Sequence, residues 1–278
     1  MKISVATTYT NPEERNDPWK EALSCYEDFA DEVVVTGKDW PHDFSWELIG
    51  ETFNQGFKKA SGDWVLRMDI DYFIHEKQMD SLIKSLKKYE EYPAVCFPQY
   101  QFFIPTKFQL KTRLCIALNK KSYPNIELNG GGDMCLATLN SKLIQAKDVP
   151  NLNIPIYQYD SMFRTKDIIS LDRSRFASAW FNYFGSYGDR GGSEPDIAYE
   201  YWYKNIRKKY MFHTNDFKIN NHPKYIKEKL YSLENDQFGH DGFGLKNLNN
   251  KDFKNFIIGK KDIYLGGRIN NLRRTLDF

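Results

Sequence analysis

The sequence lacks several features that mark large classes of protein. Its formal net charge is only +2 over 278 residues, and it contains neither an arginine-rich helix nor the spacing of a zinc finger. Surfaces that bind duplex nucleic acid carry a clear excess of positive charge. Nucleic acid is therefore not expected as the main partner.

Long apolar runs are also missing, and no leader sequence is expected. The amino-terminal stretch MKISVATTYTNPEER turns polar after six residues, which does not fit a secretory signal peptide. No run approaches the roughly 20 apolar residues that span a bilayer. We expect a soluble, cytoplasmic protein without a transmembrane segment.

Cysteine is scarce, and its spacing carries no metal motif. The four cysteines, Cys25, Cys96, Cys115 and Cys135, are far apart and form no CxxC pair. This pattern is typical of reduced, partly buried thiols in a cytosolic protein. We therefore expect these thiols to be reduced.

Aromatic residues, by contrast, are abundant: 18 Tyr, 20 Phe and 6 Trp make up 16% of the chain. Such rings stack on sugars and bases, and they also build cores. The stretches 100–103 and 178–187 could form a platform for an acceptor sugar. For most of these rings we expect the core.

The first hundred residues alternate between strand patterns and helix patterns. This order predicts an α/β fold with a mostly parallel sheet and helices on both of its faces. In such sheets ligands bind beyond the carboxyl ends of the strands. Asp17-Pro18 is expected to supply an N-cap and a proline at the first helical position. The expected strands are 3–8, 32–37, 63–71 and 94–98, and the expected helices lie around 18–30, 46–57 and 82–89.

The remainder is less regular. Extended, aromatic-rich segments are expected over 99–139, followed by helices over 166–184 and about 196–210. The glycine-rich loop between these helices, 185–195, is long enough to act as a lid. A short strand, a turn at His222-Pro223 and a further helix are expected next.

The last 28 residues, from Lys251, carry seven Lys or Arg against three Asp. This excess of positive charge could attract the tail weakly to an anionic membrane surface. An ordinary solvated tail packed on the domain is the favoured interpretation.

Two aspartates, Asp69 and Asp71, end the apolar stretch GDWVLRMDIDYF at 62–73. Residues i and i+2 of a strand point to the same side, so both carboxylates can converge on one point. Hard carboxylate oxygens suit Mg²⁺ or Mn²⁺, which take substrate phosphates as further ligands. Alternatively, Asp69 pairs with Arg67 and Asp71 caps the following helix. We favour the metal.

With these motifs the chain resembles the GT-A glycosyltransferases, close to family 2. The resemblance is carried by ISVATTYTN, DEVVVTGKD and FNQGFKKASGDWVLRMDID, and covers about the first hundred residues. It implies a Rossmann-like GT-A fold with a smaller acceptor-side region and a C-terminal helical extension. Residues 1–100 would be the nucleotide-sugar half of a single domain, 101–235 the acceptor-binding and catalytic half, and 236–278 the extension.

The resemblance also implies an activity and the residues that serve it. The chain would transfer a hexose from a nucleotide sugar, a UDP-sugar by expectation, to a hydroxyl of a glycan or other acceptor, with inversion and with Mn²⁺ or Mg²⁺. Asp71 would bind the metal directly, and Asp69 would lie near the ribose and the metal. The other nucleotide-sugar contacts would be Thr8 and Tyr9 at the base and ribose, Asp39 at the uracil, Asn54 and Arg67.

An inverting reaction needs a base to deprotonate the acceptor. Its expected place is YQYDSMFR, with Asp160 as the base and Arg164 nearby, although Tyr159 stands where the family usually has a first acid. Asp133, after three glycines, is the second candidate. Each of the two could instead cap a turn.

A late histidine often completes the metal site in this family. His222 matches it in position and is taken as a metal ligand, with His240 as the alternative. His75 is expected to pack near the site rather than to bind the metal.

Two other functions compete with glycosyl transfer. A sugar-nucleotide nucleotidyltransferase would need a glycine-rich phosphate loop after the first strand, but ATTYTNPEER contains no glycine. A non-catalytic carbohydrate-binding module could use the aromatic residues, yet it leaves Asp69 and Asp71 unexplained.

Overall fold

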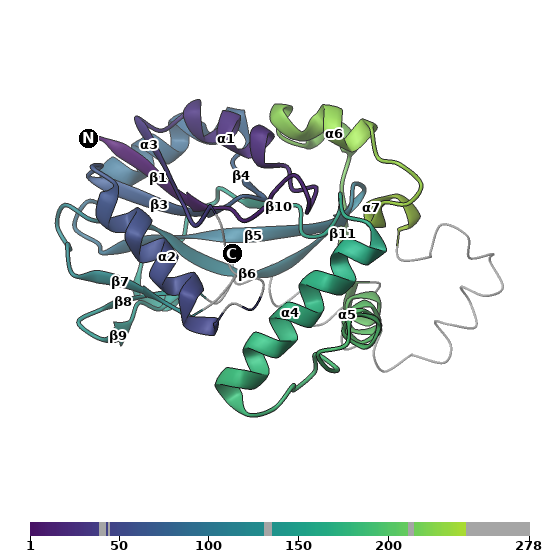
Figure 1. The fold of residues 1–278 in the computed structure, drawn as a ribbon. Helices are drawn as coiled ribbons and strands as arrows, with labels where there is room; N and C mark the ends of the chain where they lie inside the picture. Colours follow the sequence, from purple (N-terminus) through teal and green to yellow (C-terminus); the bar gives the residue numbers. More distant parts are fainter. Residues whose placement is uncertain (39–42, 44, 131–134, 211–213, 243–278) are drawn as a thin grey trace.

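The structure, a computed structural model, describes residues 1–38, 43, 45–130, 135–210 and 214–242 (Figure 1). Asp39, Asp133 and the basic tail from Lys251, which carried predictions, lie outside these ranges. No helix in the described part of the chain is long and apolar enough to cross a membrane.

The core of the fold is an eight-stranded sheet with the strand order β2-β1-β3-β6-β5-β10-β4, in which β11 pairs with β6. β1 and β2 pair in parallel, as do β1 and β3, and β5 and β10. Because β6 and β4 each run antiparallel to their neighbours, the other six strands share one direction. The strands are β1 (Ile3–Thr8), β2 (Glu32–Thr36), β3 (Trp64–Asp69), β4 (Tyr72–Phe73), β5 (Ala94–Ile104), β6 (Lys107–Asn119), β10 (Ile156–Gln158) and β11 (Thr214–Asp216).

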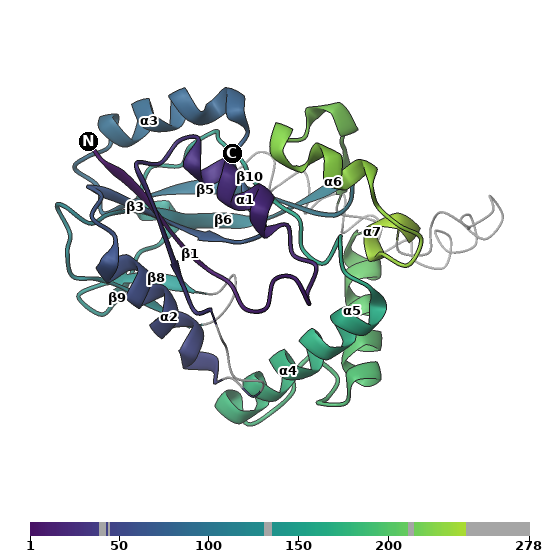
Figure 2. The same ribbon diagram turned by 45° about the horizontal axis from the view of Figure 1, so that its top comes forward.

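Helices cover both faces of this sheet (Figures 1 and 2). α1 and α3 lie on one face, where their apolar residues join the largest core cluster with Trp64 and Leu66. α2 lies on the other face and buries Phe53 and Phe57. The helices are α1 (Trp19–Glu27), α2 (Trp46–Lys59), α3 (Met79–Lys88), α4 (Lys166–Phe184), α5 (Pro195–Tyr210), α6 (Lys227–Tyr231) and α7 (Phe238–Asp241), with 3₁₀ turns at Glu76–Gln78, Ala146–Asp148, Ile219–Asn221 and Lys224–Ile226.

The ends of α2 show why this helix forms where it does. The Ser45 hydroxyl accepts a hydrogen bond from the amide of Leu48, which caps the first turn. At the other end, the Lys120 ammonium donates to the carbonyls of Phe57, Lys58 and Ala60. A cation at a helix C-terminus satisfies carbonyls that lack partners and complements the helix dipole.

A small second sheet packs beside α2. It consists of β7 (Ile126–Asn129), β8 (Leu136–Leu139) and β9 (Lys142–Leu143) in that order. Asn54 joins it to the helix, because its side chain donates to the Leu128 carbonyl and accepts from the Leu128 amide, both at 2.8 Å. Asn54 therefore acts as a structural bridge between α2 and β7.

The cysteine prediction is confirmed for two thiols and wrong for the other two. Cys25 and Cys135 are free and buried, and burial raises their pKa values to about 12 and about 11. Cys96 and Cys115 form a disulfide. These two face each other across the β5–β6 pair, a closeness that sequence spacing does not reveal.

The predicted α/β order is confirmed, with local corrections. β5 runs to Ile104, six residues beyond the predicted end at Pro98, and crosses the expected border between residues 100 and 101. Pro18, not Asp17, is the N-cap of α1, and no side chain caps that helix. His75, not Asp71, caps the 3₁₀ turn that follows, by accepting a hydrogen bond from the amide of Lys77.

Candidate active site

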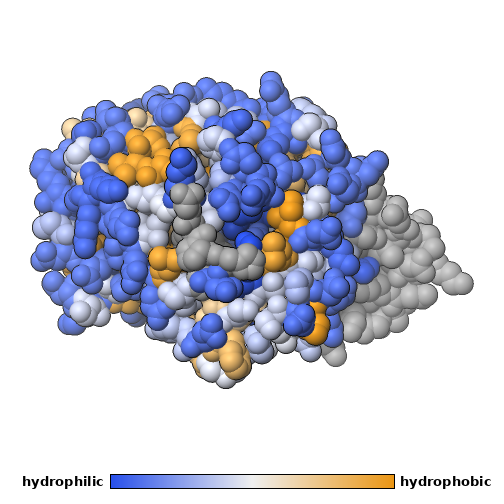
Figure 3. Space-filling view, viewed as in Figure 1, coloured by the Kyte–Doolittle hydropathy of each residue, from blue (hydrophilic) through white to orange (hydrophobic). Residues whose placement is uncertain are grey.

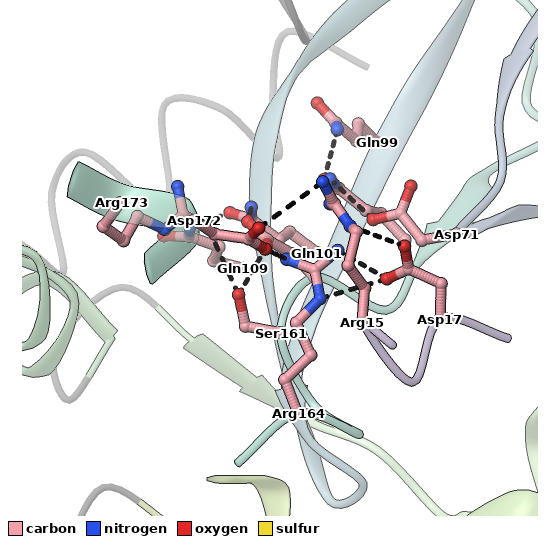
Figure 4. Close-up of polar contacts among 12 residues, drawn as sticks. Arg15, Asp17, Asp71, Gln99, Gln101, Gln109, Ser161, Arg164, Asp172 and Arg173 are labelled. Atoms are coloured by element: carbon pink, nitrogen blue, oxygen red, sulfur yellow. Dashed lines mark hydrogen bonds and ion pairs between the residues drawn. The ribbon is translucent and has the colours of Figure 1, made fainter. Parts of the chain in front are cut away.

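Charged side chains from distant parts of the chain meet at the carboxyl edge of the sheet (Figure 4). They come from the loop after β1, the turn after β3, the segment after β10 and the first half of α4. We call this set the charged cluster; its members are Arg15, Asp17, Asp71, Asp160, Arg164, Asp172 and Arg173.

Asp69 and Asp71 reach this edge through a turn rather than along one strand. β3 ends at Asp69, Ile70 and Asp71 form the turn, and β4 begins at Tyr72. The Tyr26 hydroxyl holds the turn by donating to the carbonyls of Asp69 and Tyr72. The two carboxylates therefore have different neighbours, although both lie at the same edge.

Asp69 is held by Arg67, its neighbour on the same face of β3. Nη1 of Arg67 donates to Oδ1 of Asp69 at 2.9 Å. Arg67 is buried between the rings of Phe53 and Tyr72. Burial lowers the pKa of Arg67, but the negative charge of Asp69 raises it by more, so the net shift of the pKa is upward. The ion pair between Arg67 and Asp69, which the sequence offered as an alternative to metal binding, is thus present. The Asp69 side chain remains 21% exposed.

Asp71 is the carboxylate with an open oxygen. Its Oδ2 accepts a hydrogen bond from Nε2 of Gln158 at 3.2 Å, and no described residue donates to Oδ1. Burial raises its pKa to about 7, and the carboxylates of Asp69, Asp160 and Asp17 act in the same direction. A carboxylate whose negative charge is disfavoured in this way is stabilised by a bound cation.

Asp160 lies in the opposite electrostatic environment. Its Oδ1 accepts hydrogen bonds from Ser161 at 2.8 Å and from Arg173 at 3.1 Å. Burial alone would raise its pKa, but Arg173, Lys111 and Arg164 together lower it. Asp160 is therefore stabilised in its ionised form, whereas the ionised form of the nearby Asp71 is disfavoured.

Arg164 lies at the centre of the charged cluster, but it donates hydrogen bonds to Asp17 and Asp172 rather than to Asp160. It donates from Nε to Asp17 at 3.0 Å and from Nη1 to Asp172 at 2.8 Å. Arg15 in turn donates to Asp17 at 3.0 Å. Asp17, predicted as a helix cap, is thus part of a buried ionic link between the loop after β1 and the start of α4.

His222 does not join the carboxylates. It is fully buried, its Nε2 lies 2.8 Å from the Pro105 carbonyl, and its Nδ1 lies 2.7 Å from the Tyr159 hydroxyl. Since a carbonyl only accepts, Nε2 donates and Nδ1 accepts. Burial lowers the pKa to about 4. With both nitrogens engaged by protein groups, this arrangement does not support His222 as a metal ligand.

The other predicted residues are placed as follows. Thr8 ends β1, and Tyr9 follows it with its ring 5.7 Å from that of Trp19. Both lie at the carboxyl edge of β1, and their contact with a nucleotide stays a prediction. His240, the alternative metal ligand, lies in the short helix α7.

Sequence reasoning missed several members of this site. Arg15, Asp172 and Arg173 carried no motif, and neither did the buried glutamines on β5, β6 and β10. The glutamines did leave a signal: Gln99 and Gln101 alternate with aromatic residues in PQYQFF, as do Gln158 and Asp160 in YQYD. This period of two places one face of each strand toward polar partners.

Asp69 and Asp71 could hold the implied cation only if a substrate supplied further ligands to it. No group of three or more His, Cys, Asp or Glu side chains that could hold a metal exists within the described residues. Mg²⁺ and Mn²⁺, however, commonly bind through one or two carboxylates and complete their shell with water and phosphate oxygens. The open oxygen of Asp71 and the exposed part of Asp69 meet that requirement.

Comparisons with known proteins give remote likenesses. No protein-family model matches the sequence, and no curated protein matches it. Among solved structures, S. aureus TarS 1–349 in complex with UDP is similar with a TM-score of 0.37 and 13% identity, over 95% of this chain and 80% of that one. The same protein in complex with UDP-GlcNAc gives 0.35 and 13%, over 74% and 73%.

A further similar structure is a glycosyltransferase involved in the glycosylation of the major capsid of PBCV-1. It has a TM-score of 0.27 and 14% identity, over 36% of this chain and 52% of that one. At TM-scores of this size the likeness assigns no role to any residue of this chain.

Proposed function

We propose that this chain is a nucleotide-sugar-dependent glycosyltransferase that transfers a hexose from a UDP-sugar to a hydroxyl group of a glycan acceptor. The observation that carries the proposal is the pair Asp71 and Asp160 at the carboxyl edge of the sheet. One carboxylate has a raised pKa and the other a lowered one. Two acids whose environments separate their pKa values in this way commonly have different roles in catalysis.

Asp71 is the proposed metal ligand, and Asp69 supports it. Bound there, Mn²⁺ or Mg²⁺ would neutralise the charge that develops on the leaving diphosphate. Thr8 and Tyr9 are the proposed contacts to the nucleoside, because they lie at the carboxyl edge of β1. Arg67 instead supports Asp69, because its side chain is only 1% exposed and pairs with that carboxylate. Asn54 is left out of this set, since both of its amide atoms are used by Leu128.

Asp160 is the proposed base. The acceptor oxygen attacks the anomeric carbon, the bond from that carbon to the phosphate oxygen breaks, and the hydroxyl proton passes to Asp160. Oδ1 of Asp160 already accepts from Ser161 and Arg173, so the acceptor hydroxyl would use the second acceptor site of Oδ2, whose other donor is Gln101. Attack from the side opposite the leaving group would invert the anomeric centre.

The proposed acceptor surface is the aromatic group around the end of α4. Trp46 of α2 contacts Phe176, Trp180, Tyr183 and Phe184, with ring centroids 5.2–6.4 Å apart. Tyr183 and Phe184 are 52% and 47% exposed. Exposed rings suit the apolar faces of sugars, whereas most other aromatic residues of the chain lie in the core. Figure 3 shows apolar residues in separate patches on a mainly hydrophilic face.

Thermal melting with a panel of nucleotides and nucleotide sugars, each with Mn²⁺ or with EDTA, tests the proposal. A ligand that binds only the folded chain raises the melting temperature by mass action. We expect stabilisation by UDP and one UDP-sugar in Mn²⁺ but not in EDTA. Asp71→Asn serves as the matched control and should lose that response.

The exposed rings also fit a second candidate, a carbohydrate-binding module without catalytic activity. Such a module would bind glycan fragments equally well in EDTA and would show no response to any nucleotide. That combination would reject the transferase in favour of the module.

A further inference from the structure

Four glutamines lie buried in the sheet beside the charged cluster. Gln99 and Gln101 on β5, Gln109 on β6 and Gln158 on β10 are 0%, 2%, 8% and 4% exposed. Burying an amide is costly unless its groups are hydrogen-bonded. Four such amides on adjacent strands therefore require partners arranged with care, and the carboxylates are among them.

The strand register brings these side chains together. Gln109 is paired with Gln101, and Gln101 with Gln158, so the three form one row across β6, β5 and β10. Gln99 lies two residues before Gln101 on the same face of β5, and Asp160 two residues after Gln158. Long side chains reach both their direct and their diagonal neighbours across strands.

Hydrogen bonds within this set form two chains, each of which ends on one carboxylate (Figure 4). In the first, Gln109 donates to Gln101, and Gln101 donates to Oδ2 of Asp160 at 3.0 Å. In the second, Gln99 donates to Gln158 at 2.5 Å, and Gln158 donates to Oδ2 of Asp71 at 3.2 Å. Each candidate catalytic carboxylate thus ends its own chain of two glutamines.

The carboxylate fixes the direction of each chain. An ionised carboxylate only accepts, so the glutamine next to it must present its NH₂ group. The carbonyl oxygen of that glutamine then points away and must accept from the glutamine behind it. Glutamic acid at the same place would repel the carboxylate, and lysine would neutralise it. Of these three residues, only glutamine orients the carboxylate without removing its charge.

We propose that Gln158 and Gln101 are positioning residues, each dedicated to one carboxylate: Gln158 holds Asp71 so that its open oxygen receives the metal, and Gln101 holds Asp160 for proton transfer. This inference rests on the function proposed above. Residues that orient a metal ligand typically alter metal affinity or activity by 10–100-fold when replaced. Because a different glutamine donates to each carboxylate, we expect their effects to separate.

The test compares Gln158→Met with Gln101→Met, substitutions that keep the length of the side chain and remove the donor. Manganese affinity is measured by electron paramagnetic resonance in the presence of saturating UDP. Turnover is measured as UDP release from the UDP-sugar selected by the melting panel. Gln55→Met, at an exposed position on α2, is the matched control.

Gln158→Met should weaken Mn²⁺ binding about 10-fold, and Gln101→Met should leave it within two-fold of wild type while lowering kcat about 10-fold at an unchanged KM. If both variants changed both quantities to the same degree, or neither changed its own, the glutamines would be structural and the proposal would be overturned. Should Gln158→Met not fold, Gln99→Met gives the answer, because it leaves Gln158 in place but removes the donor that orients it. A weaker Mn²⁺ affinity in that variant supports the role, and an unchanged one contradicts it.

Failure of the proposed function gives a different result. A wild-type chain that binds neither UDP nor Mn²⁺ with UDP rejects the transferase, and the assigned roles with it. A wild-type chain that binds both, with unaltered variants, rejects only the role of the glutamines.

Discussion

The charged side chains at the edge of the sheet are held in different ways in two regions of the molecule. In the amino-terminal region, residues 1–73, Asp69 is paired with Arg67, two residues before it on the same strand. In the central region, residues 94–184, the partner of Arg164 is Asp17, 147 residues away in sequence. The first pair is local and partly open to water, whereas the second is buried and joins distant segments.

This difference separates two uses of a charged pair. The local pair can form as soon as β3 forms, because residues i and i+2 share a face. The distant pair forms only when the loop after β1 has met the start of α4. Asp71 is shared by the two regions: it lies in the amino-terminal region, directly after β3, but its hydrogen-bond donor is Gln158 on β10 of the central region.

The largest effect is expected at the residue that the regions share. Asp71→Asn keeps the shape of the side chain and removes the charge proposed to bind the metal. Losing a metal worth about 4 kcal/mol to the transition state lowers turnover about 1000-fold. Steady-state UDP release measures this, with exposed Asp80→Asn on α3 as the control. Residual activity above a tenth of wild type would disprove the role of Asp71.

Replacing one arginine in each region tests the contrast directly. Arg164→Met leaves the buried carboxylates of Asp17 and Asp172 with Arg15 as their remaining shared cation, and we expect a loss of about 3 kcal/mol in the free energy of unfolding. Arg67→Met leaves only Asp69, which water can reach, and should cost clearly less. Urea denaturation followed by circular dichroism measures both. Equal losses would show that the distance between partners has no bearing on their contribution.

The central region alone supplies the proposed base. Asp160→Asn should lower kcat about 100-fold, because general base catalysis contributes at least that factor. Mn²⁺ affinity and the KM for the donor should stay at their wild-type values, which distinguishes this variant from Asp71→Asn. If Asp160→Asn also weakened Mn²⁺ binding, the assignment of one role to each region would fail.

His222 follows the central region in sequence, but its partners Pro105 and Tyr159 belong to that region, so it provides a pH test there, away from the sheet edge. Burial lowers its pKa to about 4 in the folded chain, below the ordinary value of 6.5. The unfolded chain therefore takes up the proton first, so the free energy of unfolding falls as the pH drops below 6.5. By pH 5 the loss reaches about 2 kcal/mol. Urea denaturation at pH 6.5 and at pH 5 should show this fall in the free energy of unfolding for the wild type and a smaller fall for His222→Gln.

The smallest effect is expected at the proposed acceptor surface. Tyr183→Ala removes an exposed ring at the end of α4 and should raise the KM for a glycan acceptor about five-fold, in line with the modest free energy of one aromatic contact. Binding of UDP with Mn²⁺, followed by calorimetry, should be unchanged. A loss of UDP binding would instead place this surface in the nucleotide site.

Much of the amino-terminal region could be predicted from the sequence because its signals are local. The alternation of apolar strands and amphipathic helices appears in the order of β1, α1, β2, α2, β3, α3 and β5. Asp69 and Asp71 were predicted at the edge of the sheet and lie there, although Asp71 is in the turn that follows β3 rather than in the strand. In the central region, the long helix α4 was also predicted with its observed bounds, because its periodicity is a local signal too.

The central region could not be predicted to the same extent, because its contacts depend on which strands become neighbours. The disulfide Cys96–Cys115 and the row of Gln101, Gln109 and Gln158 follow from strand pairings that no spacing in the sequence announces. His222 matched a metal ligand by its place in the sequence, but its neighbours are Tyr159 and Pro105. Similarly, Asp17 matched a helix cap, while the ion pair with Arg164 takes its carboxylate.

The link between Asp17 and Arg164 also bears on the order of events during synthesis. A nascent chain that has emerged as far as β4 holds Asp71 but neither Gln158 nor Arg164. At roughly 5–20 residues per second, on the order of 10 s pass before those partners leave the ribosome. Throughout that interval Asp17 and Asp71 remain exposed to water and the edge of the sheet is incomplete. The charged cluster is therefore expected to assemble after the first three strands, as a late step in folding.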